Sequence, residues 1–343
     1  MRTTNQLTLD DIARQAGVAR STVHRVLNNS GSASKETRQR VLEAIAHLKK
    51  EKATHGQSFN DRPHHLAVIC PSVWSPEREG LYRIYYRGVH QAAAEQGFVV
   101  HLISAQAHES PLHLVDEFHQ EGILNLDSVV VMGLSEEDPT LHNFHRRGIA
   151  VCIMGRYLSS SPFGWVGVDY EEGAYLAIHY LAGLGHRRIV LASQGHPSPS
   201  YHGWHTAGYQ RAMREADLIV DPTLIINNAE QAVEQIVEQV QRGATGIYAT
   251  TDELAITLCR ILTDHGWTIP DDVSIVSFND LTAKDHNPPL TAIFWSHQLV
   301  GPLAVQIVAS RIKNPYIQAQ HTILRPELHI RSTTAPAPAP NRR

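Results

Sequence analysis

Two short amphipathic segments joined by one glycine, within residues 8–28, constrain this chain more than any other feature. Apolar residues recur every three or four positions, at Leu9, Ile12, Ala13, Ala16, Val18, Val23, Val26 and Leu27. This spacing predicts two short helices that share a small apolar core. Gly17 stands between them, and glycine readily adopts the positive φ that a tight turn requires. The segment therefore predicts a helix-turn-helix.

The second of these helices presents only polar and basic side chains outward. They are Arg20, Ser21, Thr22, His24, Arg25 and Asn28. No carboxylate among them would repel phosphate. In a helix-turn-helix the second helix lies in the DNA major groove, where an arginine fork matches the O6 and N7 atoms of guanine. A solvated helical hairpin without a ligand is the alternative for this pattern taken alone.

A third helix is predicted over residues 34–50, with Ser34 as its N-cap. Its apolar residues, at Val41, Leu42, Ile45 and Leu48, complete a three-helix core. Residues 1–52 contain ten Lys and Arg against five Asp and Glu, whereas the whole chain has a net charge of -4. Such segregation of positive charge is typical of a nucleic-acid-binding module attached to another domain. The charge pattern favours DNA binding over the bare hairpin.

The motif T-L-x-D-I-A-x-x-A-G-V-x-x-x-T-V-x-R-V-L-N, followed by S-x-x-T-R-x-R-V, resembles the DNA-binding head of the LacI (lactose repressor) family. The resemblance implies that Arg20, Ser21 and Arg25 read base edges. It also implies phosphate contacts for Thr8, Thr22, Asn28, Ser34 and Thr37. The family usually has serine where this chain has Ala19, and losing that helix cap costs up to about 1 kcal/mol.

Residues 51–65 are predicted to be a linker between the head and the rest of the chain. Relatives of this family have a hinge helix here, with the pattern Y-x-P-N-x-x-A-x-x-L, which inserts leucine into the minor groove. Counting without gaps, this chain has Gly56 at the alanine and Phe59 at the leucine. Glycine disfavours a helix by about 1 kcal/mol relative to alanine. Phe59 is the candidate for a wedge in DNA, with packing against the body or a loose position as the alternatives.

From Leu66 onward, apolar strand-like segments alternate with helical ones. Strands are expected at 66–70, 98–103, 128–132, 149–153, 188–192, 223–226, 246–249 and 273–277. Helices are expected at 81–96, 111–121, 139–147, 171–184, 203–216, 230–242 and 252–265. This alternation predicts more than one parallel sheet covered by helices on both faces, with ligands at the carboxyl ends of the strands.

Motifs along this region resemble the effector domain of the same family. They are Val166-Gly-Val-Asp169 with Gly173, Leu181-x-x-Leu-Gly-His-Arg-Arg-Ile189, Ala207-Gly-Tyr209, Ile269-Pro-Asp-Asp-Val-Ser-Ile-Val276, Pro288-Pro-Leu-Thr291 and Leu324-Arg-Pro-Glu-Leu-x-x-Arg-Ser-Thr333. The resemblance implies a small all-α head and an α/β body of the periplasmic-binding-protein-like type I. This body has two doubly wound parallel-sheet sub-domains crossed by three strands, with a small molecule between them.

The expected domains are a helix-turn-helix head at 1–50, the linker at 51–65, an effector-binding and dimerisation body at 66–335 and a disordered tail at 336–343. The Ala-Pro repeats of the tail lack the heptad leucines of a tetramerising helix. We therefore expect a homodimer. A dimer presents two recognition helices about one DNA turn apart, so its operator should be a pseudo-palindrome in duplex DNA.

Aromatic residues at predicted strand–helix junctions suit stacking on the C–H face of a sugar. The resemblance adds polar positions, of which His205, Thr251 and Asn279 stand where the family often has Arg, Asn and Asp. The expected effector contacts are Tyr82, Trp165, Asp169, Trp204, His205, Thr251 and Asn279. Less guanidinium and carboxylate in the pocket favours a neutral sugar or polyol over an anion. The alternative for each residue is a core or junction position.

Several other functions are disfavoured by what the sequence does not contain. No apolar run suits a signal peptide or a membrane span, so a cytoplasmic protein is expected rather than a secreted solute-binding protein or a membrane protein. Cys70, Cys152 and Cys259 lie apart in apolar runs, which indicates reduced core residues. The histidines lack Cys or carboxylate partners at ligand spacing, so neither a metal site nor another cofactor is expected.

No nucleotide-binding G-x-x-x-x-G-K-[ST] motif and no G-x-S-x-G motif occurs, so the chain is not expected to be an enzyme. The expected function is sequence-specific transcriptional regulation, as a repressor whose operator affinity is modulated by a small molecule. Three alternatives stay open: control by a partner protein, a nucleobase-type ligand, and activation instead of repression.

Overall fold

The structure is a computed structural model that describes residues 9–27, 34–54, 62–70, 76–104, 111–122, 125–132, 139–155, 161–193, 199–229 and 232–339. The chain divides into two compact units, Met1–Arg62 and Pro63–Arg343. We call them the head and the body. The division falls inside the predicted linker.

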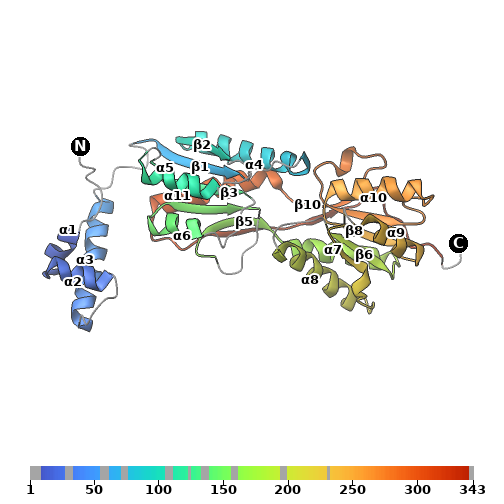
Figure 1. Cartoon of the computed structure of the whole chain (residues 1–343), viewed down its shortest axis with the longest axis horizontal. Helices are drawn as coiled ribbons and strands as arrows, with labels where there is room; N and C mark the ends of the chain where they lie inside the picture. Colours follow the sequence, from blue (N-terminus) through green and yellow to red (C-terminus); the bar gives the residue numbers. More distant parts are fainter. Residues whose placement is uncertain are drawn as a thin grey trace. The chain divides into compact units, whose positions relative to one another are not determined.

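The head consists of three helices, α1 (Leu9–Ala16), α2 (Arg20–Leu27) and α3 (Lys35–Thr54) (Figure 1). Ile12, Val23 and Val41 from the three helices are buried in one apolar cluster. Gly17 has a φ of 62°, as the turn between α1 and α2 predicted. Helix α3 continues to residue 54, beyond the expected end at 50, because residues 51–54 contain no helix-breaking glycine or proline. The predicted linker is therefore shorter than expected at its start.

The first sub-domain of the body contains a six-stranded sheet in the order β11-β5-β4-β3-β1-β2, in which every pairing is parallel. Its elements are β1 (His64–Cys70), α4 (Pro76–Glu95), β2 (Phe98–Ser104), α5 (Pro111–Gln120), β3 (Ser128–Met132), α6 (Pro139–Arg146), β4 (Ala150–Met154), β5 (Gly164–Val168), α11 (His297–Lys313) and β11 (His321–Leu324). Parallel strands buried on both faces explain why these segments are almost continuously apolar.

Helices cover both faces of this sheet. Leu112 of α5 and Phe144 of α6 share a buried apolar cluster with alternate residues of the strands, such as Ile69. Helices α4 and α11 pack against each other so closely that a Cβ added at Gly301 would lie 2.5 Å from the backbone nitrogen of Val89. Each face therefore has its own helix layer.

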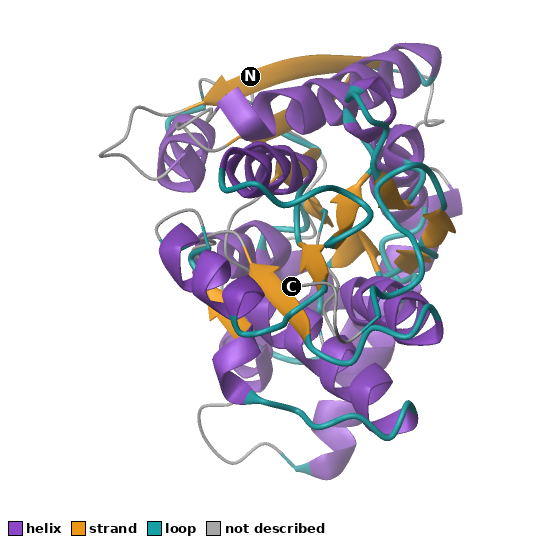
Figure 2. Cartoon of the chain, turned by 90° about the vertical axis from the view of Figure 1, so that its right-hand side faces the viewer, coloured by secondary structure: helices purple, strands orange, loops and turns teal. Residues whose placement is uncertain are grey.

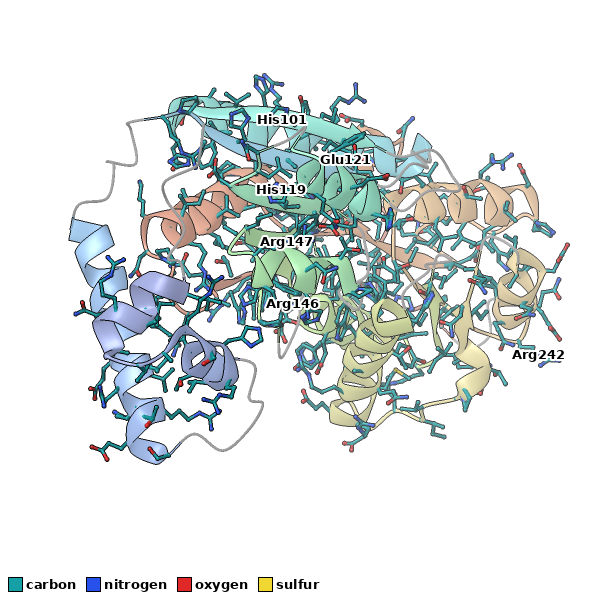
Figure 3. All side chains as sticks on the ribbon, turned by 60° about the vertical axis from the view of Figure 1, so that its left-hand side comes forward. His101, His119, Glu121, Arg146, Arg147 and Arg242 are labelled. Carbon is teal, nitrogen blue, oxygen red and sulfur yellow. The ribbon has the colours of Figure 1, made fainter. Side chains whose placement is uncertain are left out.

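Polar contacts join neighbouring elements of the first sub-domain. Arg147, just after α6 and labelled in Figure 3, forms an ion pair with Asp116, which is buried on α5. His101 of β2, labelled in the same view, stacks on His65 of β1, with 2.8 Å between Nε2 and Nδ1. Burial and the neighbouring His65 lower the pKa of His101. These contacts fix the helices and the edge strand of the sheet.

The second sub-domain contains a sheet in the order β12-β10-β9-β8-β6-β7, parallel except for the β10–β12 pair. Its elements are α7 (Tyr170–Gly183), β6 (Ile189–Ser193), α8 (Pro199–Glu215), η1 (Pro222–Leu224), β7 (Ile225–Asn227), α9 (Val233–Gln241), β8 (Gly246–Ala249), α10 (Asp252–Asp264), β9 (Ser274–Asn279), η2 (Ala283–Asp285), β10 (Thr291–Phe294) and β12 (Glu327–His329). Figure 2 shows the strands enclosed by helices.

The chain passes between the sub-domains three times, after β5, after β10 and after β11. The predicted fold class, with two doubly wound sheets and three crossings, is confirmed. Strand β5, strands β10 to β12 and helix α11 were not among the individually expected elements. Strand β5 begins with Gly164 and contains Gly167, and Pro302 lies inside α11. Local patterns of that kind hide elements that tertiary packing stabilises.

The cysteines and the end of the chain allow a comparison with the expectations. Cys70, Cys152 and Cys259 are free and buried, as predicted. Residues 336–339 were expected to be disordered, but the backbone N–H of Ala337 donates to the carbonyl of Leu184 at 2.9 Å. Leu184 is the C-cap of α7, so this bond attaches the start of the tail to the end of that helix. Among the described residues, no helix is both long enough and apolar enough to span a membrane.

Candidate functional site

Helix α2 of the head separates apolar from polar side chains. Val23 and Val26 face the core, while Arg20, Ser21 and Arg25 are exposed. The Nε atom of Arg25 donates to the carbonyl of Ser21 at 3.3 Å, and a terminal nitrogen donates to Thr22 Oγ1 at 3.2 Å. These contacts hold the guanidinium along the outer surface of α2. The three residues expected to read bases therefore share one exposed helix.

The start of α3 supplies the other described residues expected to contact DNA. Ser34 Oγ accepts the backbone N–H of Thr37 at 3.1 Å and lies 2.8 Å from Thr37 Oγ1. This is the predicted N-cap, and it leaves further backbone N–H groups of the first turn available to an anion. Thr8, Asn28 and Phe59 lie outside the described residues.

Arg40 of α3 fixes the turn of the helix-turn-helix. Its guanidinium donates to the carbonyl oxygens of Ala16 at 2.7 Å and of Gly17 at 3.3 Å. A cation at the carboxyl end of α1 also interacts favourably with the helix dipole. No local sequence pattern indicates this contact, because it joins residues 24 positions apart. Arg40 thereby holds α1 and its turn against the third helix.

Aromatic rings gather in the second sub-domain, where α7 and α8 begin. Tyr170, the first residue of α7, stacks on Trp204 of α8 with ring centroids 5.6 Å apart and an interplanar angle of 5°. It also contacts Tyr201 edge-on and Phe278 of β9. We call Tyr170, Tyr201, Trp204, His205 and Phe278 the aromatic cluster. Tyr201 and Trp204 are only partly buried, so the cluster offers ring surface to a ligand.

His205 lies at the base of the aromatic cluster. It is fully buried, and its Nδ1 lies 2.9 Å from the hydroxyl of Tyr248 on β8. The rings of Tyr201 and Phe278 contact it edge-on, with centroids 4.6 and 5.2 Å away. Burial raises the pKa of Tyr248 well above its ordinary value, so that phenol stays neutral. Aromatic rings, a neutral phenol and an imidazole therefore occupy this place in the fold.

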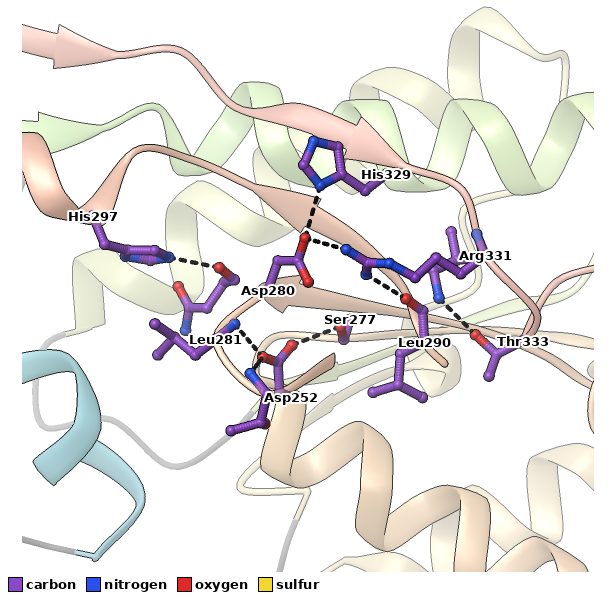
Figure 4. A network of polar contacts seen from close by, with 12 residues as sticks. Asp252, Ser277, Asp280, Leu281, Leu290, His297, His329, Arg331 and Thr333 are labelled. Carbon is purple, nitrogen blue, oxygen red and sulfur yellow. Dashed lines mark hydrogen bonds and ion pairs between the residues drawn. The ribbon is translucent and has the colours of Figure 1, made fainter. Parts of the chain in front are cut away.

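Asn279, at the end of β9, connects the second sub-domain to the β10–α11 crossing. It has a φ of 104°, its side-chain oxygen accepts Trp295 Nε1 at 3.1 Å, and its carbonyl accepts His297 Nε2 at 2.6 Å. Asp280 follows and accepts a terminal nitrogen of Arg331 at 2.6 Å (Figure 4). Two consecutive residues with positive φ indicate a strained segment held in place by these bonds.

The Asp280 carboxylate also accepts His329 Nδ1 at 2.8 Å (Figure 4). Arg331 has a second acceptor in the carbonyl of Leu290, at 2.7 Å. The charges of Asp280 and Arg331 are therefore used within the protein, which leaves them less available to an ionic ligand.

The first sub-domain contributes two tyrosines of α4, and the glycine that follows β4, to the same region. Tyr82 and Tyr85 of α4 are buried. A Cβ added at Gly155, directly after β4, would lie 3.4 Å from the ring of Tyr85. The carbonyl of Gly155 accepts the hydroxyl of Tyr170 at 2.6 Å. The aromatic cluster and the tyrosines of α4 therefore meet where the two sub-domains face each other.

Three residues expected in the effector site have other roles in the structure. Trp165 is 2% exposed in the apolar core of the first sub-domain, where it stacks on His321 at 4.9 Å. Asp169 accepts the backbone N–H of Glu172 as the N-cap of α7, at 2.9 Å. Thr251 is the N-cap of α10 and accepts Leu254 N at 3.2 Å. A core contact explains the first, and helix capping explains the other two.

Asp252, which the sequence indicated as a helix-start residue, is buried and accepts three hydrogen bonds. The donors are Ser277 Oγ at 2.7 Å and the backbone N–H groups of Leu281 at 2.6 Å and Thr282 at 2.9 Å (Figure 4). Burial raises its pKa, against the opposing effect of these bonds. Asp252 thereby fixes the segment after Asn279 to the start of α10.

Five residues of this region were not predicted from the sequence: Tyr85, Tyr170, Tyr201, Phe278 and His297. Tyr201, Trp204 and His205 recur at helical spacing on α8, which was a detectable signal. Tyr170 directly follows the Asp169 that ends the V-G-V-D motif. For Tyr85 and His297 no local pattern was available, because they come from two helices that only the fold brings together.

Comparison with known proteins covers both units. The model of bacterial regulatory proteins of the lacI family matches residues 8–49, and that of a periplasmic binding protein-like domain matches residues 178–334. The HTH-type transcriptional regulator DegA of Bacillus subtilis is 27% identical over 338 residues, which span 96% of this chain and 98% of DegA.

Two solved structures share the fold over nearly the whole chain. A complex of the transcriptional regulator CelR with cellobiose has a TM-score of 0.70 at 24% identity and covers 96% of this chain and 100% of its own. The lac repressor dimer bound to operator and the anti-inducer ONPF has a TM-score of 0.64 at 20% identity, with the same coverage of 96% and 100%. These relatives are regulators of transcription rather than enzymes. The two family models that match the head and the body, together with the similarity along the full length, thus show that this chain belongs to the LacI family of bacterial transcriptional regulators.

Proposed function

We propose that this protein is a repressor that binds a pseudo-palindromic operator as a homodimer and releases or retains it according to a neutral sugar or polyol held between the sub-domains. The observation that carries the regulatory role is the exposed, basic face of α2 in a compact head attached to a two-sub-domain body. The head supplies sequence selectivity and the body supplies the response to a small molecule.

The head supports selective DNA binding through two kinds of contact. Arg20, Ser21 and Arg25 offer donors that match base edges in the major groove, where one good bidentate pair discriminates by about 1–3 kcal/mol. Thr22, Ser34 and Thr37 offer hydroxyl and backbone donors to phosphate, which set position and orientation. In this reading Thr8, Asn28 and the wedge residue Phe59 complete the interface.

The body supports a neutral, hydroxylated effector. Trp204, Tyr170 and Tyr201 supply ring faces, and the imidazole of His205 and the amide of Asn279 supply polar groups nearby. Tyr82 adds an aromatic wall from α4. The bound cellobiose of the structural neighbour CelR is in keeping with this ligand class. Since Asp169 and Thr251 serve as helix caps, we assign them the role of shaping the pocket.

The homodimer is supported by strand β2 at the edge of the first sheet. An edge strand has unpaired backbone groups that favour association with another chain. The apolar side chains of Val99 and Leu102 on this strand are 40% and 47% exposed. The structural neighbour lac repressor was solved as a dimer bound to its operator, which is in keeping with a dimeric regulator. Because a transcriptional regulator must reach chromosomal DNA, we infer that the protein works in the cytoplasm.

An effector changes operator affinity only if it binds one arrangement of the sub-domains more tightly than the other. Genomic fragments selected by binding to the purified full-length protein, followed by footprinting, test the function. The expected result is a protected pseudo-palindrome whose affinity changes when a neutral saccharide is added. Absence of any protected palindrome, with or without cell extract, would contradict the proposal.

A further inference from the structure

Two buried polar atoms at the junction of the sub-domains have no hydrogen-bond partner among the described residues. They are the hydroxyl oxygen of Tyr85 on α4 and Nδ1 of His297 at the start of α11. Both side chains are 2% exposed. Buried polar atoms are nearly always paired, because leaving one unpaired in the folded protein costs the full desolvation penalty. Each such atom in a native structure therefore calls for a partner.

Ring contacts place both residues at one location. Tyr85 meets Trp295 edge-on with centroids 6.3 Å apart, and Trp295 lies 4.0 Å from the ring of His297. A Cβ added at Gly155 would lie 3.6 Å from the Tyr85 hydroxyl, and Gly155 is the residue that bonds Tyr170 of the aromatic cluster. The unpaired atoms therefore adjoin the aromatic cluster, across the boundary between the sub-domains.

The bonding of His297 determines what its free nitrogen can do. Its Nε2 lies 2.6 Å from the carbonyl oxygen of Asn279, which only accepts hydrogen bonds, so Nε2 carries the proton. Burial lowers the pKa of His297 to about 4, so the ring is neutral at physiological pH. A neutral imidazole with a protonated Nε2 has a lone pair on Nδ1. Nδ1 is therefore an acceptor that needs a donor.

Tyr85 supplies the complementary group. Burial raises its pKa well above the ordinary value, with smaller contributions from Tyr170 and Tyr82. The phenol keeps its proton and needs an acceptor. Arg331 is a charged donor in the network of Figure 4, but its guanidinium is already bonded to the Asp280 carboxylate and the Leu290 carbonyl, so it is not the donor that His297 Nδ1 requires. Both groups are thus neutral. The Tyr85 hydroxyl requires an acceptor, whereas His297 Nδ1 requires a donor.

We propose that Tyr85 and His297 are the polar half of the effector site, and that a neutral polyhydroxyl ligand donates a hydroxyl proton to His297 Nδ1 while another of its oxygens accepts from Tyr85. This inference rests on the proposed function, which supplies the effector, and it adds the two residues that select the class of ligand. A sugar acid keeps hydroxyls that can donate to Nδ1, but its carboxylate would lose its hydration beside two neutral groups, while Arg331 is already bonded to Asp280 and Leu290; an anion is therefore disfavoured. The aromatic cluster holds the apolar face of the same ligand.

The experiment uses the full-length protein with Tyr85→Phe and His297→Phe. Tyr209→Phe is the matched control, because the Tyr209 hydroxyl is buried but donates to the Ile189 carbonyl at 2.9 Å. Thermal unfolding is measured without additive and with D-glucose, D-ribose, cellobiose, sorbitol, gluconate or hypoxanthine. Titration calorimetry then gives the dissociation constant for each probe that stabilises the wild type.

Without additive, Tyr85→Phe should unfold at the wild-type temperature or above, because it removes an unpaired group. Tyr209→Phe should unfold at a lower temperature. At least one neutral polyhydroxyl probe should stabilise the wild type, whereas gluconate should not. That probe should bind Tyr85→Phe and His297→Phe at least about fivefold more weakly, which is the usual effect of losing one hydrogen bond. Tyr209→Phe should bind it as the wild type does.

Three results would overturn the inference. The first is a loss of stability in Tyr85→Phe equal to that in Tyr209→Phe, because the hydroxyl would then be paired within the protein. The second is unchanged affinity of both Tyr85→Phe and His297→Phe for the neutral probe, as expected if water alone satisfies the two atoms. The third is stabilisation by gluconate or hypoxanthine and by no neutral polyhydroxyl probe. In each case operator binding by the wild type would remain, which separates this failure from failure of the proposed function.

Discussion

The hydroxyl of Tyr170 donates a 2.6 Å hydrogen bond to the carbonyl oxygen of Gly155. Tyr170 begins α7 of the second sub-domain, and Gly155 directly follows β4 of the first. The bond therefore sets the separation of the sub-domains beside the aromatic cluster. A ligand that changes this separation must alter the bond, so Tyr170 is the residue at which a movement between the sub-domains can be monitored.

Replacing Tyr170 with phenylalanine removes this bond and keeps the stacking on Trp204. The free energy of unfolding should fall by about 1 kcal/mol, the usual net contribution of one hydrogen bond. Urea unfolding measures it. Tyr175→Phe is the control on the same helix, because its hydroxyl bond to Glu215 is exposed. Equal stabilities for Tyr170→Phe and the wild type would show that the bond does not join the sub-domains in solution.

Arg25→Ala should abolish specific operator binding and leave saccharide-induced thermal stabilisation unchanged. The Arg25 side chain is exposed and, among the residues that the structure describes, bonds only to its own helix, so we expect the fold to tolerate its removal. Fluorescence anisotropy on the footprinted operator measures the loss. Arg242→Ala removes the same charge at the C-cap of α9, where Arg242 pairs with Glu238, and should bind normally. Parallel loss of DNA and saccharide binding in Arg25→Ala would contradict separate roles for head and body.

Gly208→Ala should destabilise the body by about 3 kcal/mol, the usual cost of severe overpacking. A Cβ at Gly208 would lie 2.1 Å from the carbonyl oxygen of Glu171, so α7 and α8 would have to separate. Gly203→Ala on the same helix meets nothing within 4 Å. It should instead stabilise by up to about 1 kcal/mol through helix propensity. Chemical denaturation of both variants checks the opposite signs.

Acidification should destabilise the body through His297. Burial lowers its pKa to about 4 from the ordinary 6.5. Between these pH values the unfolded chain binds a proton that the folded protein does not bind. Stability is therefore present above pH 6.5 and falls as the pH approaches 4, by about 3 kcal/mol in total.

Urea unfolding of the wild type and His297→Phe at pH 7, 6 and 5 tests this contribution. The variant should lose less stability on acidification, because phenylalanine binds no proton. A pH dependence should persist in the variant, since burial also lowers the pKa of His186. Identical pH profiles for the two proteins would show that His297 does not contribute.

The sequence by itself determined the head, the alternation of the body and the family. The period of apolar residues around Gly17, the cap at Ser34 and the exposed arginines of α2 are local features, and each is formed by residues close together in the chain. The same holds for the buried parallel strands, whose nearly continuous apolar runs reflect helices on both faces. Such segments can be predicted because their structure depends on residues that are close together in the chain.

Only the tertiary structure decided which side chains meet between the sub-domains. Trp165 and Tyr170 both lie near the first crossing, yet one is in the core and the other bonds Gly155. Tyr85 and His297 are separated by more than 200 residues, and α4 and α11 bring them to one place. The orientation of a side chain at a junction depends on distant packing partners, and no periodicity along the chain encodes it.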